Sequence, residues 1–278
     1  MAATLADRAR RFVALHQGPG AFVMPNPWDV GSARILAGLG FQALATSSGA
    51  SAAVLGRRDG QVSRDEALAH ARAIADATDL PVSADLEHGF GDPPEEVAET
   101  IALAARVGLA GASIEDATAD RARPLYEFHL AVERVAAAAE AARALPHPFV
   151  LTARTETFLR GRPDLEETIR RLRAFERAGA DVLFAPGLPD LVAVREVCAA
   201  VTKPVNFMAG IRGRSFSVAA LEAAGVRRIS LATSLYRAAV RGLVDAAREV
   251  RERGTFDYVE RALTTTELHT LMGVTDRT

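Results

Sequence analysis

The sequence has very few of the side chains that would point to redox or Schiff-base chemistry. Its 278 residues include one cysteine, Cys198, so no disulfide can form within the chain, which is typical of a protein from a reducing compartment. Cys198 lies in a stretch with a helical pattern, where we interpret it as a small buried residue and not as a nucleophile. Lys203 is the only lysine, so a catalytic lysine could only be this one.

The charge balance and the hydropathy pattern argue against two classes of partner. The formal net charge is −2, which does not provide the basic surface that nucleic-acid binding requires. No apolar run approaches the roughly 18 residues of a membrane helix. The first residues, MAATLADRARRF, have no apolar segment of the kind found in signal peptides. We therefore expect a cytoplasmic protein whose partners include neither nucleic acid nor membrane.

What the sequence does contain is a globular composition, with 49% hydrophobic and 24% charged residues. Eight short apolar segments have the composition of β-strands, and Ala-, Glu- and Arg-rich helical stretches separate them. The expected strands are 21–25, 42–47, 81–86, 110–115, 149–154, 181–185, 204–208 and 228–232. These runs are continuously apolar, which is typical of parallel strands covered on both faces.

A recurring sequence pattern of alanine and glycine marks the boundary between each helix and the next strand. Alanine and glycine occur together at 37–41, 105–110, 178–181 and 223–226, each time where a helix should end and need a positive φ. This repeat predicts a (β/α)8 barrel, a fold of about 250 residues, with an open doubly wound sheet as the alternative. No linker or low-complexity tract interrupts it, so we expect one domain over 1–278.

In such a barrel the chemistry lies where the strands end, and the third strand ends in an acidic pair. Asp85 and Glu87 alternate, so they are expected to project to the same side of the strand. Two adjacent carboxylates repel each other unless a cation or a proton separates them. The pair therefore predicts a site for Mg²⁺, with Mn²⁺ also possible. The alternative is a helix cap or a surface pair.

Other strand ends carry further polar groups. Glu115 and Asp116 end the fourth strand, where burying acids is costly unless they have partners. Ser47, Ser48 and Gly49 follow the second strand and could bind a carboxylate, although a plain loop explains them equally well.

Single residues near the other strand ends have two interpretations each. Asp59 could add negative charge, but a lone loop aspartate is more often structural. Arg154 ends the fifth strand and suits a bidentate carboxylate contact, or else an ion pair with Glu156 or Glu115. His88 is a candidate acid or base, or a hydrogen-bonded scaffold residue. Asn206 and Arg237 follow the last two strands and could complete a ring of anion-binding groups.

These segments, in this order, resemble the isocitrate lyase/phosphoenolpyruvate mutase superfamily. The resemblance extends over nearly the whole chain, from Asn26 to Arg237. The segments that carry it are NPWDVGSAR (26–34), SSGASAAVLGRRD (47–59), SADLEHGFG (83–91), SIED (113–116), ARTE (153–156) and VNFM (205–208).

The resemblance implies a metal-dependent enzyme that makes or breaks C–C or P–C bonds beside a pyruvate-like enolate. Mg²⁺ would be held by Asp85 and Glu87 and reached through water by Asp59 and Glu115. The substrate, a small 2-oxo or 2-hydroxy (di)carboxylate, would contact Ser47, Ser48, Gly49, Asp85, Arg154, Asn206 and Arg237. The candidate catalytic residues are Arg154, Glu115, His88 and Arg121. The metal would stabilise the enolate as a Lewis acid.

Two departures bear on the activity. Lyases of this superfamily carry a cysteine, and mutases a lysine, in a loop after the fourth strand, whereas 117–125 has neither. Arg121 and Arg123 could bind a second carboxylate there, but an arginine is not a useful base. The sixth strand ends LFAP (183–186), without the glutamate that such lyases often place there.

The sequence therefore predicts a Mg²⁺-dependent lyase whose activity is low because the acid/base loop residues are missing. Within the same class, a phosphonate mutase or hydrolase is possible. The alternative from another class is a non-catalytic, metal-dependent binder of 2-oxo dicarboxylates.

The C-terminal part, 240–278, has more apolar residues than one barrel needs. An amphipathic helix is expected over 237–253, followed by a short amphipathic piece over 264–272. A large unpartnered apolar surface usually marks an interface. In the resembled superfamily the last barrel helix crosses to a neighbouring subunit, so we expect a homotetramer or homodimer. The alternative is that 254–278 folds over the bottom of its own barrel.

Overall fold

Eight parallel strands form the centre of the molecule in the computed structural model, which describes residues 3–120 and 122–274. The strands are β1 (Phe22–Met24), β2 (Leu44–Ala45), β3 (Val82–Asp85), β4 (Gly111–Glu115), β5 (Val150–Arg154), β6 (Val182–Phe184), β7 (Val205–Met208) and β8 (Arg228–Ser230). Each lies inside the range expected from the sequence. Neighbours pair in parallel in the order β1-β8-β7-β6-β5-β4-β3-β2, and the Ala45 N–H donates to Pro25 O across the remaining seam at 3.0 Å. The predicted (β/α)8 barrel is confirmed.

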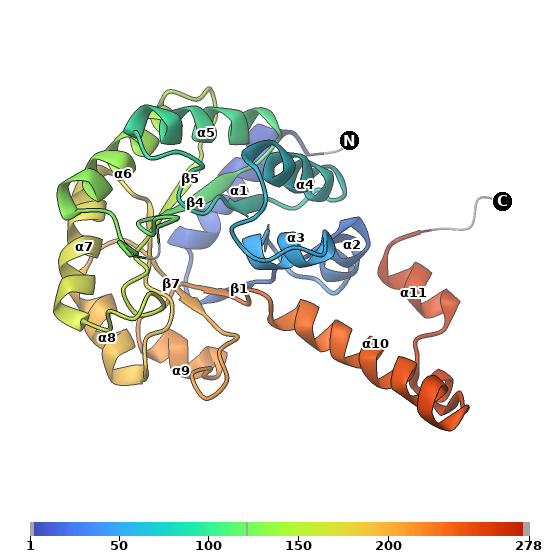
Figure 1. Cartoon of the computed structure of the whole chain (residues 1–278). Helices are drawn as coiled ribbons and strands as arrows, with labels where there is room; N and C mark the ends of the chain where they lie inside the picture. The colour runs from blue at the N-terminus through green and yellow to red at the C-terminus, as the bar shows by residue number, and fades with distance from the viewer. Residues whose placement is uncertain (1–2, 121, 275–278) are drawn as a thin grey trace.

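Helices surround this barrel (Figure 1). They are α1 (Leu5–Gln17), α2 (Val30–Gly38), α3 (Ser48–Val54), α4 (Arg64–Asp76), α5 (Pro94–Arg106), α6 (Phe128–Arg143), α7 (Leu165–Ala178), α8 (Leu191–Ala200), α9 (Val218–Ala223), α10 (Ser234–Arg253) and α11 (Thr265–Leu271), with a 3-10 turn η1 (Asp257–Arg261). The expected turn glycines Gly40, Gly108, Gly179 and Gly225 all have positive φ, between 86° and 109°. No helix in the described ranges is long and apolar enough to cross a membrane.

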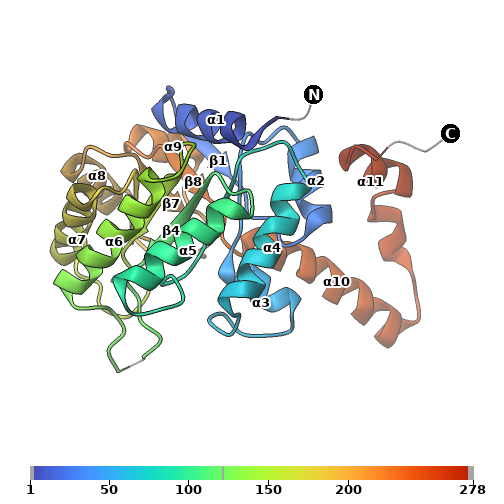
Figure 2. The ribbon, with the colours of Figure 1, turned by 90° about the horizontal axis from the view of Figure 1, so that it is seen from above.

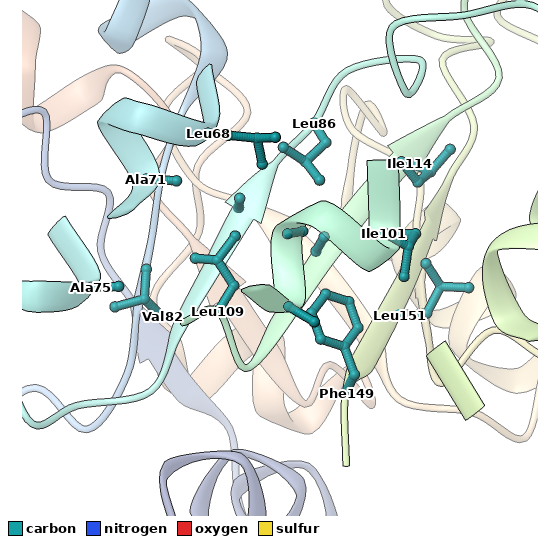
Figure 3. Close-up of a cluster of buried hydrophobic side chains, with 14 of the residues drawn as sticks. Leu68, Ala71, Ala75, Val82, Leu86, Ile101, Leu109, Ile114, Phe149 and Leu151 are labelled. Carbon is teal, nitrogen blue, oxygen red and sulfur yellow. The ribbon is translucent and has the colours of Figure 1, made fainter. Parts of the chain in front are cut away.

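The apolar core lies between the strands and the helices. One cluster joins β3, β4 and β5 to α4, α5 and α6, with Leu86, Ile101 and Leu151 fully or almost fully buried (Figure 3). A second cluster joins the strands β5 to β8 to the helices α7 to α9. Side chains on both faces of each strand are covered. For this reason apolar residues occur at consecutive positions along the strands.

Helix α1 closes the end of the barrel where the strands begin. Its Phe12 packs with Ala43, Ala110 and Val150, which precede or open β2, β4 and β5. The approach is close at Gly111, where an added Cβ would lie 2.5 Å from Val150 O and 2.9 Å from the Phe12 ring. With this end closed, the opposite end, where the strands finish, is free to hold a site.

Helix α10 projects away from the barrel instead of covering it (Figures 1 and 2). The expected amphipathic helix is confirmed, but Leu243 on its apolar side is 67% exposed. Beyond it, α11 returns to lie against α2, where Leu271 O approaches Gly38 so closely that an added Cβ would lie 2.0 Å from it.

Candidate active site

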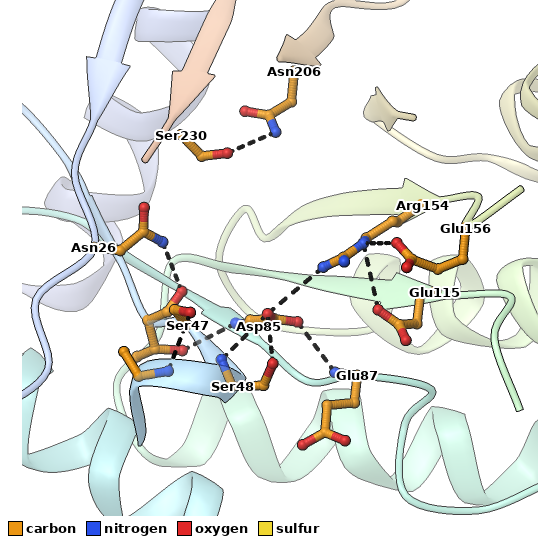
Figure 4. Close-up of polar contacts among 12 residues, drawn as sticks. Asn26, Ser47, Ser48, Asp85, Glu87, Glu115, Arg154, Glu156, Asn206 and Ser230 are labelled. Carbon is orange, nitrogen blue, oxygen red and sulfur yellow. Dashed lines mark hydrogen bonds and ion pairs between the residues drawn. The ribbon is translucent and has the colours of Figure 1, made fainter. Parts of the chain in front are cut away.

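Polar side chains gather where the strands end, as expected for this fold. A cavity of about 50 Å³ opens there, inside the ring of strands. Its lining includes Asn26, Thr46, Ser47, Ser83, Asp85, Ser113, Arg154, Phe184, Asn206, Arg228 and Ser230. Figure 4 shows Asp85 near the centre of this group, between Ser48 on one side and Arg154 on the other.

Asp85 is the last residue of β3, and its carboxylate contacts Ser48, the Glu87 N–H and Arg154. Ser48 donates to its Oδ2 from the backbone N–H at 3.3 Å and from the hydroxyl at 3.1 Å. The Asp85 N–H is held in turn by Thr46 Oγ1 at 3.0 Å. These bonds connect the end of β3 to the start of α3, so the acid has a fixed place at the mouth of the barrel.

Arg154, at the end of β5, forms the cationic centre of the site. Its guanidinium lies 3.6 Å from Asp85 Oδ2 and 3.4 Å from Glu115 Oε2, and it also donates to Glu156 (Figure 4). Burial acts against its charge, but Glu156, Glu115 and Asp85 outweigh that effect and raise the pKa of Arg154. The ion-pair alternative from the sequence is therefore observed, and it places Arg154 beside Asp85.

Glu115 is a buried acid with a raised pKa. Burial, together with Glu156 and Asp85 and against the attraction of Arg154, raises its pKa to about 8. Its second oxygen lies 3.5 Å from the guanidinium of Arg160, a half-exposed residue of the loop after β5. A carboxyl group whose pKa lies near neutrality can either hold or release a proton, which suits proton transfer.

A buried network of hydrogen bonds and an ion pair connects the ends of β4 and β5. Asp116 accepts hydrogen bonds from the Thr155 hydroxyl and the Glu156 N–H, both at 2.8 Å, and pairs with Arg171 at 3.1 Å. The acid after β4 thus has the partners that its burial requires. The network fixes the backbone that carries Glu115 and Arg154.

Glu87 lies beyond the end of β3, so the alternation of side chains along a strand does not set its direction. β3 ends at Asp85, and Glu87 has a left-handed φ of 50°, so the expectation that the two acids alternate on one strand was wrong. Its carboxylate points away from Arg154 and Glu115 (Figure 4) and lies near the turn at Gly60. Burial, then Asp85 and Asp59, raise the pKa of Glu87 to about 7. Asp59 approaches α3, since a Cβ on Gly49 would lie 3.4 Å from its Oδ2.

The donor set at this mouth fits a divalent cation of the magnesium type. Mg²⁺ prefers oxygen ligands and needs only one or two carboxylates, with water and substrate completing its shell. After burial, the nearby carboxylates of Asp85 and Asp59 disfavour the charged form of Glu87, an effect that a cation would relieve. Within 3–120 and 122–274, no three or more His, Cys, Asp or Glu side chains lie close enough together to hold a metal ion.

On the other side of the cavity, amides and hydroxyls replace the acids. Asn26 donates to Thr46 O at 2.9 Å, and its Oδ1 accepts the Leu231 N–H at 2.8 Å. Asn206 lines the cavity as expected, but its amide is committed to Ser230 and Arg228. Ser47 caps the start of α3, and Ser48 and Gly49 lie in its first turn, where a loop was expected from the sequence.

Some predicted site residues lie elsewhere. His88 is not among the residues that line the cavity, and its backbone carbonyl accepts a hydrogen bond from Arg134. Arg237 is exposed on α10 and donates to Gly210 O. Arg121 lies outside the described residues. Lys203 precedes β7 at the opposite end of the barrel, so the one lysine is not part of the site.

Sequence reasoning missed three contributors to this site. Phe184 lies under the Arg154 guanidinium, with its ring centroid 5.1 Å away. Arg160 pairs with Glu115, and Arg228 lies inside the barrel. The sequence did contain one signal for Arg228, because an arginine stands at the start of an otherwise apolar strand. Such a side chain lies either at the rim of the barrel or inside it with polar partners.

Comparisons with known proteins find relatives over nearly the whole chain. Residues 12–251 match the family model of phosphoenolpyruvate phosphomutase. A Burkholderia cenocepacia protein, assigned by inference as a lyase or mutase, is 50% identical, with a TM-score of 0.93 over 95% of each chain. The oxaloacetate decarboxylase of a Marinomonas species is 30% identical over 263 residues, covering 91% of this chain and 90% of the relative. An oxaloacetate acetylhydrolase solved with oxalate is 27% identical, with a TM-score of 0.88 over 98% of this chain and 96% of that one.

Proposed function

The chain belongs to the phosphoenolpyruvate mutase family, within the isocitrate lyase superfamily of lyases and mutases, and on this premise we propose that it is a Mg²⁺-dependent lyase. Its substrate would be a small 2-oxo or 2-hydroxy (di)carboxylate, and the bond broken would be a carbon–carbon bond. The relatives that act on oxaloacetate support a four-carbon 2-oxo dicarboxylate as the first substrate to test.

The observation that carries this proposal is the position of Arg154 beside Asp85 at the mouth of the barrel. Cleavage of a bond next to a 2-oxo acid leaves its electron pair on an enolate, whose oxygen carries the new negative charge. A buried cation already in place stabilises such a charge without reorganisation. A module that only binds carboxylates would not need a guanidinium between three acids.

The metal would be held by Asp85 and Glu87, with Asp59 and Glu115 nearby to be reached through water. When bound, it would supply Lewis-acid stabilisation of the enolate. Ser47, Ser48 and Gly49 would bind the substrate carboxylate, since Ser48 already donates two hydrogen bonds to a carboxylate in this structure. Glu115 would hold or accept a proton near the reacting carbon, consistent with its raised pKa.

A second candidate function is metal-dependent binding of 2-oxo dicarboxylates with little or no turnover. The loop 117–127, which follows β4, has neither cysteine nor lysine, and Lys203 lies at the other end of the barrel. The loop does carry Arg123, 85% exposed at its side chain, which could bind a distal carboxylate but not transfer protons.

A turnover assay separates the two functions. We expect oxaloacetate or a related 2-oxo or 2-hydroxy acid to yield pyruvate or glyoxylate in the presence of Mg²⁺, and this release to stop with EDTA. The control is Arg154→Met, which should remove turnover. If no acid of the panel is cleaved while Mg²⁺-dependent ligand binding persists, the protein is a binder and the lyase proposal is wrong.

We also propose that the protein is a homo-oligomer, either a dimer or a tetramer, with α10 seated on a second subunit. In support, Leu243, Phe256, Val259 and Leu263 are each more than half exposed. Exposed apolar surface of this extent is typical of an interface.

A further inference from the structure

The interior of the barrel holds a positive charge that the proposed reaction does not use. Arg228 opens β8 and is 3% exposed. Its Nε donates to Asn206 Oδ1 at 2.9 Å, and one terminal nitrogen donates to Thr152 Oγ1 at 2.9 Å. The other terminal nitrogen lies 3.4 Å from His16 Nε2, on the helix that closes the barrel.

All three partners of Arg228 are uncharged. His16 Nδ1 lies 2.7 Å from Phe12 O and must donate there, which leaves the Nε2 lone pair for Arg228. Burial, and then the charge of Arg228, lower the pKa of His16 to about 3, so the ring is neutral near pH 7. Among the described residues, no carboxylate forms an ion pair with Arg228, and burial alone accounts for the lowering of its pKa to about 9.

This absence of a counter-ion sets Arg228 apart from the other buried arginines. Arg154 and Arg171 each pair with carboxylates, and Arg134 donates to three carbonyls with Asp92 and Glu96 nearby. An uncompensated buried charge costs several kcal/mol. The described residues therefore place the Arg228 cation inside the barrel without an anion to balance its charge.

The cavity provides room for that anion. Its volume of about 50 Å³ exceeds the roughly 10–15 Å³ that one water needs, and Arg228 lines it together with Asn206, Ser230, Ser83 and Ser113. The Ser230 hydroxyl accepts from Asn206 Nδ2 at 3.0 Å, so its own hydrogen remains available to donate. The lining near Arg228 thus consists of a cation, hydroxyls and an amide.

We propose that this cavity binds a small monoanion, of the size and charge of chloride or of one carboxylate group, against Arg228 and Ser230. Arg228 lines this cavity from inside the barrel, and Asp85 lines the same cavity on the acidic side. Binding of an inorganic anion there does not depend on the proposed function, whereas binding of a substrate carboxylate rests on it. The anion has two possible sources, an inorganic ion from solution or a carboxylate of the substrate itself.

An anion titration of the full-length protein tests this proposal. Sodium chloride or bromide replaces sodium gluconate at constant ionic strength, and the melting temperature is followed. We expect a saturable rise in wild type that is lost in Arg228→Met and kept in Arg227→Met, which removes the neighbouring charge. Where Arg228→Met does not fold, Ser230→Ala should bind the halide at least tenfold more weakly.

A bromide-soaked crystal gives the direct measurement. An anomalous peak within hydrogen-bond distance of Arg228 supports the site, and a repeat with Mg²⁺ and oxalate identifies the source. If bromide stays, the anion is inorganic and lies beneath the substrate, whereas competitive displacement assigns the site to a substrate carboxylate. The absence of both a saturable shift and a peak at Arg228 would overturn the proposal.

Discussion

At the scale of single residues, the account depends on a few buried charges whose partners are known. Arg154 is shared by three acids, and Glu115 and Glu156 are themselves buried. Such a group stabilises the fold only while it is complete, because one missing partner leaves a buried charge without compensation. The same geometry that supports the proposed catalysis therefore also affects stability.

Replacing Arg154 by Met should lower both activity and stability. We expect a loss of about 3–5 kcal/mol in the free energy of unfolding, because Glu115 and Glu156 lose their main cation. Urea denaturation measures this loss. The matched control is Arg170→Met, which breaks an exposed pair with Glu167 and should cost no more than about 1 kcal/mol. Equal, small losses in both variants would contradict the structure of this site.

His16 gives a pH dependence with a defined sign. Its folded pKa of about 3 lies below the ordinary 6.5, so the unfolded chain binds the proton first as the pH falls. Its contribution is complete above pH 6.5 and declines toward pH 3, by up to about 1.4 kcal/mol for each pH unit. We expect His16→Asn to have a flatter decline in unfolding free energy between pH 6.5 and 4 than wild type. Identical slopes in His16→Asn and wild type would refute the assignment.

At the scale of elements, the sequence predicts the barrel well and the geometry of the site less well. The eight strands were predictable because each is covered on both faces and is bounded by turn glycines such as Gly179. Asp85, Glu115 and Arg154 were predictable because strand ends place them at one mouth. Glu87 was not, because its positive φ breaks the alternation that the prediction assumed. Arg228 was not, because its partners come from His16, Thr152 and Asn206, which are far apart in the sequence.

The C-terminal elements give a prediction about assembly. A chain that ends at Gly254 lacks η1 and α11, and we expect light scattering to show a smaller species than the full-length oligomer. Leu243→Glu should have a similar effect, since this side chain is 67% exposed on α10, whereas Val192→Glu on α8, 57% exposed, should not. A full-length protein that is monomeric at micromolar concentration would contradict the proposed interface.

At the scale of the whole molecule, the barrel separates two tasks between its ends. Helix α1 closes the end where the strands begin, and the loops at the other end carry the polar residues. The long helix α10 extends beyond this body, where it can contact another subunit (Figure 1). The proposed active site and the proposed subunit interface therefore use different parts of one chain.

The central claim is that Asp85 and Glu87 hold Mg²⁺ for an oxoacid that Ser48 and Arg154 also contact. The most direct test is the thermal stability of the protein with oxalate, measured with Mg²⁺ and again with EDTA. We predict a stabilisation of about 2.7 kcal/mol at a hundredfold excess of oxalate over its Kd, only when Mg²⁺ is present, and none in the Asp85→Asn/Glu87→Gln double variant. A shift of equal size without Mg²⁺, or an undiminished one in that variant, would contradict the account.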